Sequence, residues 1–438
     1  MKRVLILAAI LLAAISAYSL DRAHFLELNK KGRELRQKQD WKGLREVLLE
    51  IGKELPSPTP TYLLRMASVE TRLGNNAQAL AWMQRYVAMG LSYDISADDD
   101  LKPLLSDPGW KALAEKMKVG SQPFVHGQKV CTLPIADLMP EDIASDSTGR
   151  MLYVTSILHH SVYRVTLPAV NESQCRLDEV SLPPTAKRWP TLAVSFDNMR
   201  NLLWVTSSAM PEFASNPPGD DGKTALLAVD PHSGSVLHRY DLPPDAPGLL
   251  GDMTVTEQGN VFVTDSIGGG VYRVQGDSQG GLKTAQMEKI AGGFFSPQTP
   301  ALATDSKRLF VPDYAIGIAI IDLNDHNKIS YLTMPDNVAA TGLDGLLRVG
   351  DALIGVQNGT SPARIVRYRL NHEQTRVESA EVLAQGEGLG EPTHAIAVNG
   401  KIFVVANVGW NRIDDHGNLK PNEKFTAPFL LAFPQKEN

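Results

Sequence analysis

Leu152-Tyr153-Val154-Thr155-Ser156 is a short apolar segment with a polar end, and it decides the fold because its pattern recurs along the chain. Counted at the last valine before each polar end, the copies lie at positions 154, 205, 263, 311, 356 and 405, at spacings of 51, 58, 48, 45 and 49 residues. Short apolar runs of this kind predict strands, and a second strand follows each copy after a turn. Six units of about 50 residues are typical of a propeller with four-stranded blades. The other copies are Leu203-Trp204-Val205-Thr206-Ser207, Val261-Phe262-Val263-Thr264-Asp265, Leu309-Phe310-Val311-Pro312-Asp313, Leu353-Ile354-Gly355-Val356-Gln357-Asn358 and Ile402-Phe403-Val404-Val405-Ala406-Asn407.

The predicted propeller spans residues 128–435 and needs one strand from outside its six units. The strand Lys129–Leu133 precedes the first unit, so we assign it to the last blade, where it would protect the sheet edges. Of the two cysteines, Cys131 lies on this closing strand and Cys175 on the outer strand of the first blade. Outer strands of neighbouring blades splay apart, and a disulfide needs Cα atoms within about 7 Å. We therefore predict that the two cysteines are not bonded.

Residues 22–118 predict helices, because leucine and valine recur at spacings of three and four. The small residues Ala67 and Ala79 flank a turn at Gly74, which resembles a tetratricopeptide repeat. A generic bundle of helical hairpins is the alternative. About three repeats are needed to bury a continuous core, so we expect the helices to dock on the propeller. Otherwise their exposed groove would bind a separate protein partner. The predicted fold class is an all-β six-bladed propeller with a small all-α, tetratricopeptide-like N-terminal domain.

The first residues predict export. Met1-Lys2-Arg3 is positively charged, Val4–Ile15 is an unbroken apolar run, and Ala17-Tyr18-Ser19 offers small residues for cleavage. A run this short is typical of a signal peptide over residues 1–19 and is too short for a membrane span. No later segment is apolar enough to span a bilayer. We expect a periplasmic or secreted protein with no membrane span after signal cleavage.

Charge and composition exclude some classes of function. The chain has 43 Lys and Arg against 49 Asp and Glu, a net charge of −6, whereas nucleic-acid binders carry a basic face or stripe. We therefore expect no nucleic-acid partner. Two cysteines are too few for a cysteine zinc cluster. The remaining expectation is a small-molecule ligand at the mouth of the propeller.

Two segments of the blades resemble a known superfamily. They are Pro140-Glu141-Asp142-Ile143-Ala144-Ser145-Asp146 in the first blade and Thr341-Gly342-Leu343-Asp344-Gly345-Leu346 in the fifth. Over residues 130–435 the chain is similar to the gluconolactonase and regucalcin-like (senescence marker protein) superfamily, and it is close to propellers built from NHL repeats. The resemblance implies a six-bladed fold. It also implies a divalent metal, with Ca²⁺ as the candidate, held by oxygen ligands at the starts of the inner strands.

Aligned on their paired strands, the blades bring two sets of residues to one mouth. The resemblance implies metal ligands at Glu141, Gln298 and Asp344, a set of oxygen donors that suits Ca²⁺. Gln298 stands where the superfamily has asparagine, and Gly251 supplies no ligand where a second asparagine is common. The first set is Glu141, Pro190, Gly251, Gln298, Asp344 and Thr393, and the second is Asp142, Thr191, Asp252, Thr299, Gly345 and His394.

Other polar residues complete the candidate site. Asp252 or Asp344 is the candidate general base. His394 opens the inner strand of the sixth blade and is a candidate ligand-binding residue. It could act as a base, lie beside the metal, or only line the channel, and we favour the last of these. The ends of the second strands form a candidate binding ring of Asp265, Asp313, Asn358 and Asn407. Two long insertions carry Phe213 and Trp410, which we expect either at the surface or paired above the mouth.

Two functions follow from this pattern. The first is a metal-assisted hydrolase, or a binder, of a small oxygen-rich substrate such as a sugar lactone. If the chain is an enzyme, the resemblance implies a gluconolactonase-like, metal-dependent lactone hydrolase. The alternative is a non-catalytic scaffold for a ligand or a protein, which combines an NHL-like propeller with a helical adaptor.

Overall fold

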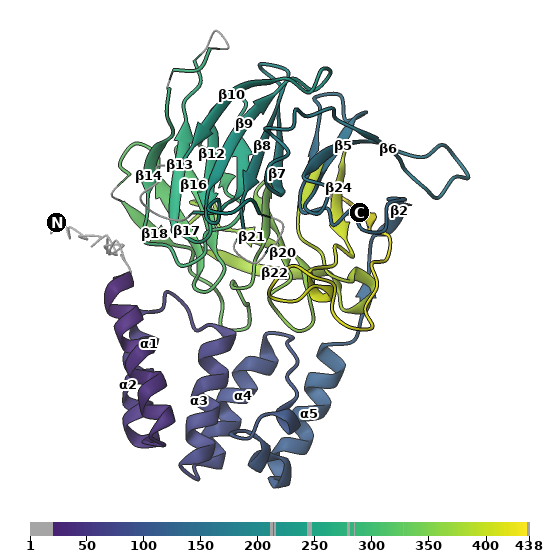
Figure 1. Cartoon of the computed structure of the whole chain (residues 1–438). Coiled ribbons are helices and arrows are strands. Elements are labelled where there is room, and N and C mark those ends of the chain that lie inside the picture. The colour runs from purple at the N-terminus through teal and green to yellow at the C-terminus, as the bar shows by residue number, and fades with distance from the viewer. Residues whose placement is uncertain are drawn as a thin grey trace, which may run out of the picture.

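The computed structural model describes residues 21–210, 213, 216–242, 248–277, 281–283, 285–326 and 328–435. The predicted signal peptide, residues 1–19, lies outside them. Among the described residues, no helix has the length and apolar character needed to cross a bilayer. Figure 1 shows two layers, with the helices beneath one face of a strand-rich body.

The helical layer contains two helical hairpins and a fifth helix. Aspartate or threonine side chains accept hydrogen bonds from the first free backbone amides of four helices, which fixes their starts. Pro60 begins the third helix, since proline is tolerated in a first turn. The elements are α1 (Arg22–Gln37), α2 (Trp41–Glu54), α3 (Pro60–Arg72), α4 (Asn76–Ala88), the 3₁₀ helices η1 (Ile95–Ala97) and η2 (Lys102–Ser106), and α5 (Pro108–Gly120).

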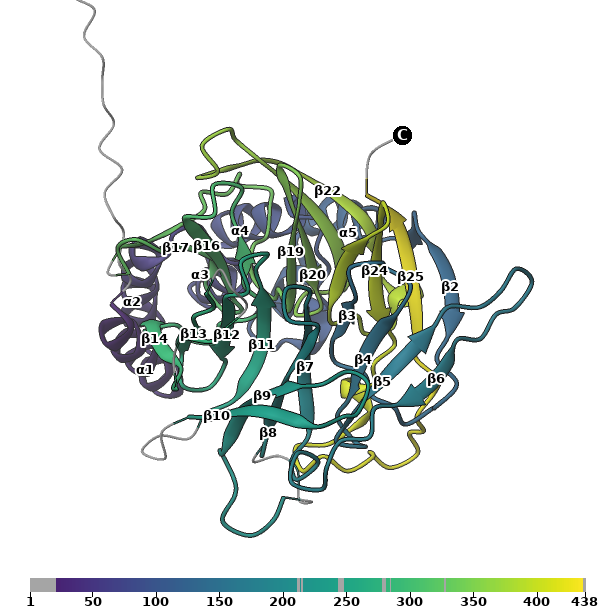
Figure 2. The ribbon, with the colours of Figure 1, turned by 90° about the horizontal axis from the view of Figure 1, so that it is seen from above.

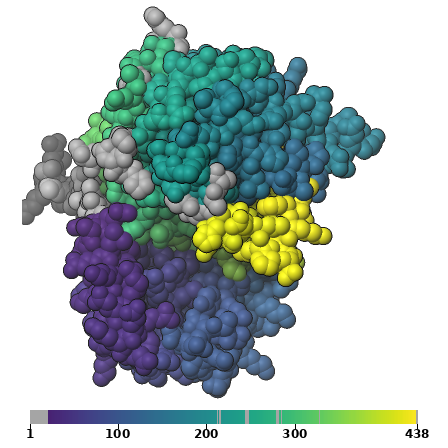
Figure 3. Space-filling model, viewed as in Figure 1, coloured from purple at the N-terminus to yellow at the C-terminus, as the bar shows by residue number. Residues whose placement is uncertain are grey.

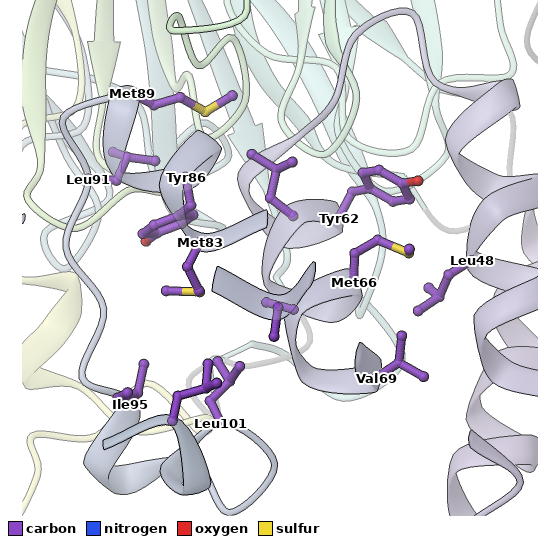
Figure 4. Close-up of a cluster of buried hydrophobic side chains, with 14 of the residues drawn as sticks. Leu48, Tyr62, Met66, Val69, Met83, Tyr86, Met89, Leu91, Ile95 and Leu101 are labelled. Carbon is purple, nitrogen blue, oxygen red and sulfur yellow. The ribbon is translucent and has the colours of Figure 1, made fainter. Parts of the chain in front are cut away.

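The helices share one apolar core, part of which is drawn in Figure 4. Met66 of α3 and Met83 of α4 are fully buried, and Leu48 of α2 lies beside Met66. Ala67 and Ala79 are also fully buried, so the small residues singled out in the sequence lie in the core of α3 and α4. Burial of such side chains contributes roughly 1.5–3 kcal/mol each for the larger ones, which holds the short helices together.

Six antiparallel sheets form the propeller, as predicted, and Figure 2 looks onto the face away from the helices. Blades one to three are β3 (Ile143–Ser145), β4 (Leu152–Ser156), β5 (Ser161–Thr166) and β6 (Arg176–Glu179); β7 (Thr191–Asp197), β8 (Leu202–Ser208), β9 (Thr224–Val229) and β10 (Val236–Asp241); and β11 (Leu250–Val255), β12 (Val261–Asp265), β13 (Gly270–Val274) and β14 (Glu288–Ala291).

Blades four to six follow in chain order, with the inner strand first. They are β15 (Ala301–Leu302), β16 (Arg308–Asp313), β17 (Gly317–Asp322) and β18 (Ile329–Tyr331); β19 (Gly345–Val349), β20 (Ala352–Gln357), β21 (Arg364–Leu370) and β22 (Val377–Gln385); and β23 (Ala395–Val398), β24 (Lys401–Ala406) and β25 (Phe429–Pro434). The short helix η3 (Glu387–Leu389) lies in the connection from blade five to blade six, and η4 (Trp410–Arg412) lies between β24 and β25 of blade six.

The ring is closed by β2 (Gln128–Thr132), which pairs with β25 in blade six, as predicted. The prediction for the cysteines was wrong, because Cys131 and Cys175 form a disulfide with Cα atoms 5.5 Å apart. The segment before β6 does not splay away from its neighbour. It runs beside β2, where Thr132 forms a parallel bridge to Gln174 and exchanges backbone hydrogen bonds with Ser173 and Cys175. Blades six and one are therefore joined covalently.

The helices dock on the propeller, as predicted. The linker after α5 forms β1 (Phe124–Val125), an unpredicted fifth strand that pairs with β22 of blade five. Buried Arg364 donates a hydrogen bond of 2.7 Å to the carbonyl oxygen of Met89, at the C-terminal end of α4. Phe25 of α1 packs edge-on against Phe295 of blade four, with ring centroids 5.2 Å apart. Figure 3 shows the two layers in close contact along this boundary.

The docked face is also the face that carries the predicted mouth. Neighbouring strands of a blade run in opposite directions, so the start of each inner strand lies beside the end of the second strand. Arg364 and its partner Gln357 mark this end of blade five, and the helices cover it. Any site at the inner-strand starts therefore lies between the propeller and the helical layer.

Candidate functional site

Three side chains from three blades converge at the mouth. Glu141, Asp344 and His394 each lie just before an inner strand, and one ligand atom from each lies within 4.8 Å of the others. They are up to 253 residues apart in the chain. The propeller places them together because the inner strands of all six blades start around one axis. Of the three metal ligands expected from the sequence, Glu141 and Asp344 belong to this cluster, in which His394 takes the third place instead of Gln298.

His394 lies at the centre of this cluster and is 2% exposed. Its Nδ1 is 2.8 Å from the carbonyl oxygen of Glu141, and its Nε2 makes a short contact with Oδ1 of Asp252. A carbonyl oxygen and a carboxylate oxygen both accept hydrogen bonds, so the ring donates from both nitrogens as an imidazolium. Burial lowers the pKa of His394, but the carboxylates of Asp142 and Asp252 outweigh it and hold that pKa well above its ordinary value.

Asp252 and Asp142 surround this imidazolium. The Thr299 hydroxyl lies 2.7 Å from Oδ1 of Asp252. Asp142 accepts hydrogen bonds from the amides of Ile143, at 2.7 Å, and Val194, at 2.9 Å. Burial raises the pKa of Asp142 to about 6, although the positive charge of His394 opposes the shift. Both carboxylates favour the charged form of the histidine, and Asp252 together with the carbonyl oxygen of Glu141 fixes its orientation.

Glu141 and Asp344 form the other half of the cluster, and each has one oxygen held by a neutral donor. Trp410 Nε1 donates to Oε2 of Glu141 at 2.6 Å, and Asn358 Nδ2 donates to Oδ2 of Asp344 at 2.6 Å. Burial and the charge of Asp344 raise the pKa of Glu141 well above its ordinary value. Burial raises the pKa of Asp344 to about 7, with His394 opposing the shift.

The charges of the cluster do not balance. Glu141, Asp142, Asp252 and Asp344 place four carboxyl groups around one imidazolium, so either bound protons or a further cation must compensate the excess negative charge. Hydrogen bonds occupy Oε2 of Glu141 and Oδ2 of Asp344, which leaves the second oxygen of each carboxylate for a ligand. Carboxylate oxygens suit a hard cation such as Ca²⁺. His394 fits as a charged neighbour rather than as a ligand, because both of its nitrogens are engaged.

The other predicted site residues mostly stabilise loops. Gln298 donates from its amide to the Ser296 hydroxyl at 2.8 Å. Asp265 and Asp313 accept hydrogen bonds from the backbone amides of nearby turns, as aspartate commonly does. Asn407 donates to Thr426 and accepts from Arg412, which fastens the blade-six extension. Of the predicted ring, Asn358 is the member that contacts the cluster directly.

Sequence reasoning missed two residues of the site. The Tyr314 hydroxyl donates to Oδ1 of Asn358 at 3.1 Å, which fixes the amide that faces Asp344. Glu391 accepts a hydrogen bond from the amide of Asn411, at 2.9 Å, and so holds the turn that carries Trp410. The position of Tyr314, one residue after the ring position Asp313, was the available signal.

Trp410 and Phe213 pair near the mouth, with ring centroids 6.2 Å apart and nearly perpendicular planes. Because Trp410 also donates to Glu141, the blade-six extension covers one side of the cluster. Parts of the blade-two insertion, residues 211, 212, 214 and 215, lie outside the described residues. Of the two alternatives for these aromatic residues, the structure shows the pair, and Trp410 also contacts Glu141 of the cluster.

Two cavities lie near the cluster. The central channel is a cavity of about 570 Å³ that is lined by the inner strands and reaches Asp142, Thr299 and His394. On the other side, a cavity of about 390 Å³ lies between the helices and blades four and five, and Tyr314 lines it. The channel thus reaches the cluster at Asp142 and His394, whereas the second cavity approaches it through Tyr314, which holds Asn358 beside Asp344.

Comparisons with known proteins give matches at the level of solved structures. No family model matches the chain, and no curated protein matches it. It is similar to regucalcin from Agrobacterium tumefaciens, at 14% identity over 71% of this chain and 93% of that one, with a TM-score of 0.45. It is also similar to a putative oxidoreductase (glucose dehydrogenase) from Thermus thermophilus, at 13% identity over 71% of this chain and 100% of that one, with a TM-score of 0.46. Virginiamycin B lyase from Staphylococcus aureus matches at 15% identity over 64% of this chain and 80% of that one, with a TM-score of 0.41. The chain is a six-bladed β-propeller preceded, within its described residues, by five α-helices, and the solved structures similar to it include regucalcin and glucose dehydrogenase propellers.

Proposed function

We propose that the chain is an exported, metal-assisted hydrolase, or a binder, of a small oxygen-rich substrate such as a sugar lactone. The observation that carries this proposal is the convergence of Glu141, Asp344 and His394 within 4.8 Å at the mouth. Buried carboxyl groups in excess of nearby positive charge destabilise a fold, so such a cluster is typical of a functional site.

The residues divide into two groups by what their contacts allow. Glu141 and Asp344 would hold a divalent cation such as Ca²⁺ through the oxygens that Trp410 and Asn358 leave free. When bound, the cation would supply a positive charge that polarises a substrate carbonyl. Asp344 is also the candidate proton acceptor. Burial raises its pKa to about 7 without a cation, and the positive charge of a bound cation would lower that pKa and keep Asp344 as a carboxylate. Asp252 is held by His394 and Thr299, so it positions the histidine instead.

The second candidate is a non-catalytic scaffold, and one observation favours it. The helices cover the mouth face from blades four and five, while Trp410 covers Glu141 from blade six. A covered mouth suits a protein that holds a ligand for a long time. In either case we propose that the protein is periplasmic or secreted. It would bind a small-molecule ligand at the mouth and a protein partner through its helical layer.

Metal binding and turnover distinguish the two candidates. We would measure bound Ca²⁺, Mn²⁺ and Zn²⁺ in the purified protein, titrate the stripped protein with each ion, and assay a panel of sugar lactones. Glu141→Gln and Asp344→Asn should each weaken cation binding at least tenfold and abolish metal-dependent turnover. Asp351→Asn is the matched control, because this exposed aspartate lies at the far end of blade five.

Each result selects one candidate. Cation binding and turnover that both variants remove would establish the hydrolase. Cation binding without turnover would leave a metal-containing binder. If the protein binds no cation and hydrolyses none of the lactones, the hydrolase is refuted and the scaffold remains.

A further inference from the structure

The boundary between the helices and the propeller contains a continuous groove. A cavity of about 280 Å³ on the helices and the cavity of about 390 Å³ against blades four and five share six lining residues. We call their union the interdomain groove. Ligand sites are commonly clefts of roughly 300–1,000 Å³ at domain interfaces, so the groove has the size of a small-molecule site. The shared residues are Asn29, Arg33, Leu48, Ile51, Thr61 and Arg65.

The part of the groove against the propeller is lined by apolar and aromatic side chains, and its charged side chains are all positive. Phe25 and Tyr62 line it from the helices, and Phe295 and Tyr314 from blade four. Leu26 also lines it and is 43% exposed, although it is a large apolar side chain. Among its described lining residues, Arg33 and Arg65 are the charged ones, and no acidic residue lines this part. This contrasts with the net charge of −6 for the whole chain.

The two arginines lack carboxylate partners among the described residues. Arg65 donates to the neutral side chain of Asn29 at 2.9 Å. The nearest arginine along α1, Arg36, is paired with Asp100. Arg33 and Arg65 are exposed, and desolvation by the surrounding groove together with the positive charges of Arg33 and Arg36 lowers the pKa of Arg65. The cavity on the helices, which both arginines also line, contains Asp98 and Asp100. Asp100 is paired with Arg36 and Arg72, and Asp98 accepts a hydrogen bond from Tyr93. The two arginines therefore leave a positive potential in the part of the groove against the propeller, which an anion would neutralise.

We propose that the interdomain groove binds a small organic anion, with its carboxylate or phosphate on Arg33 and Arg65 and its apolar part among Phe25, Tyr62 and Phe295. Arginine binds both anions through paired N–H donors, and aromatic walls take up the apolar part. The site is made by both layers, so binding tightens their docking. It uses none of the carboxyl groups of the mouth and goes beyond the function proposed above.

The test measures binding to the full-length protein in EDTA, so that the acidic cluster takes no part. Isothermal titration would use 3-phenylpropionate and phenyl phosphate as anionic probes, with 3-phenylpropanamide as the neutral analogue and inorganic phosphate as the anion without an apolar part. We expect at least one anionic probe to bind ten times more tightly than both comparison compounds. The double variant with Arg33→Gln and Arg65→Gln should weaken that binding at least tenfold. Arg150→Gln is the control, since this exposed arginine lies in a loop of blade one.

Thermal unfolding separates a binding role from a structural one. Without ligand, Arg33→Gln should leave the Tm unchanged or raise it, because the substitution removes a repulsion. A marked fall in Tm would mean that the arginine stabilises the fold, which contradicts the proposal. Equal binding of the neutral amide, or unchanged binding by the double variant, would also overturn it. Tighter binding of an acetylated peptide than of either small anion would overturn the choice of a small molecule. The function proposed for the mouth is tested with cations and with Glu141→Gln and Asp344→Asn, whereas the groove is tested with anions in EDTA. Either proposal can therefore fail while the other stands.

Discussion

Asp344→Asn should stabilise the metal-free protein above pH 7, although it removes a residue of the site. Burial raises the pKa of Asp344 from 3.8 to about 7 in the folded protein. Between these values the folded state holds a proton that the unfolded state has lost. The free energy of unfolding therefore falls as the pH rises from 4 to 7, and it is flat above 7.

The magnitude follows from the size of the shift. A change of about three pKa units corresponds to about 4 kcal/mol at 1.36 kcal/mol per unit. This is the upper limit, because Glu141 and His394 change their own protonation when the charge of Asp344 is removed. We expect a gain of about 1–4 kcal/mol for Asp344→Asn above pH 7 and none near pH 4. Asparagine can still accept the hydrogen bond that Asn358 donates to Asp344.

The assay is thermal unfolding of wild type and Asp344→Asn in EDTA at pH 4, 5, 6, 7 and 8, with Asp351→Asn as control. Each kcal/mol shifts Tm by roughly 2–4 °C in domains of 150–250 residues and by less in larger ones. The advantage of the variant should grow by about 1.4 kcal/mol per pH unit at most and level off above pH 7. A variant that is less stable than wild type at pH 8, or a difference that does not change with pH, would refute this reasoning. Added Ca²⁺ should raise the Tm of the wild type and leave the Tm of Asp344→Asn unchanged.

Three further predictions concern the closure, the docking and the mouth. Reducing the disulfide between Cys131 and Cys175, which closes a loop of 44 residues, should lower the free energy of unfolding by about 4 kcal/mol. The Tm should therefore be lower in dithiothreitol, and an unchanged Tm would contradict this. Arg364→Met removes the hydrogen bonds to the side-chain oxygen of Gln357 and the backbone carbonyl oxygen of Met89, and each unpaired oxygen costs about 1–3 kcal/mol. Proteolysis of the linker at 121–127 should therefore be faster than in the wild type. Equal cleavage rates would mean that other contacts hold the helices on the propeller. Trp410→Phe removes the hydrogen-bond donor to Glu141, so titration should show cation affinity reduced by about 1.5–3 kcal/mol, roughly 10- to 150-fold. Unchanged affinity would place the cation elsewhere.

The number of blades was predictable because the sequence repeats the same strand pattern once in each blade. Each blade buries the same strand pair, so Val154 and its equivalents must recur at the length of one blade, and all six lie in strands. The closing strand was predictable for a related reason, since a sheet edge left open at Lys129 would expose unpaired backbone groups. The helical layer followed from the spacing of leucine and valine. These features depend on local periodicity, which a single sequence displays.

The site was predictable only in part. Aligning the blades identified Glu141, Asp252, Asp344 and His394 as neighbours, because equivalent positions in a ring of blades lie around one axis. The same alignment grouped Asp265, Asp313 and Asn407 with them, yet their side chains are committed to hydrogen bonds in turns and in the blade-six extension. The direction of a side chain at a strand end depends on the local turn, which position along the repeat does not specify.

The sequence by itself determined six blades, a helical front and an acidic mouth, because each is encoded in residues that are close in the chain or repeated along it. The tertiary structure decided which distant groups meet. It placed Cys175 beside Cys131 through an irregular segment that no periodicity describes. It also set the helices over the mouth face, since this depends on contacts such as that between Arg364 and Met89, 275 residues apart. Contacts over such distances are fixed by the packing of whole layers, and a local pattern does not contain them.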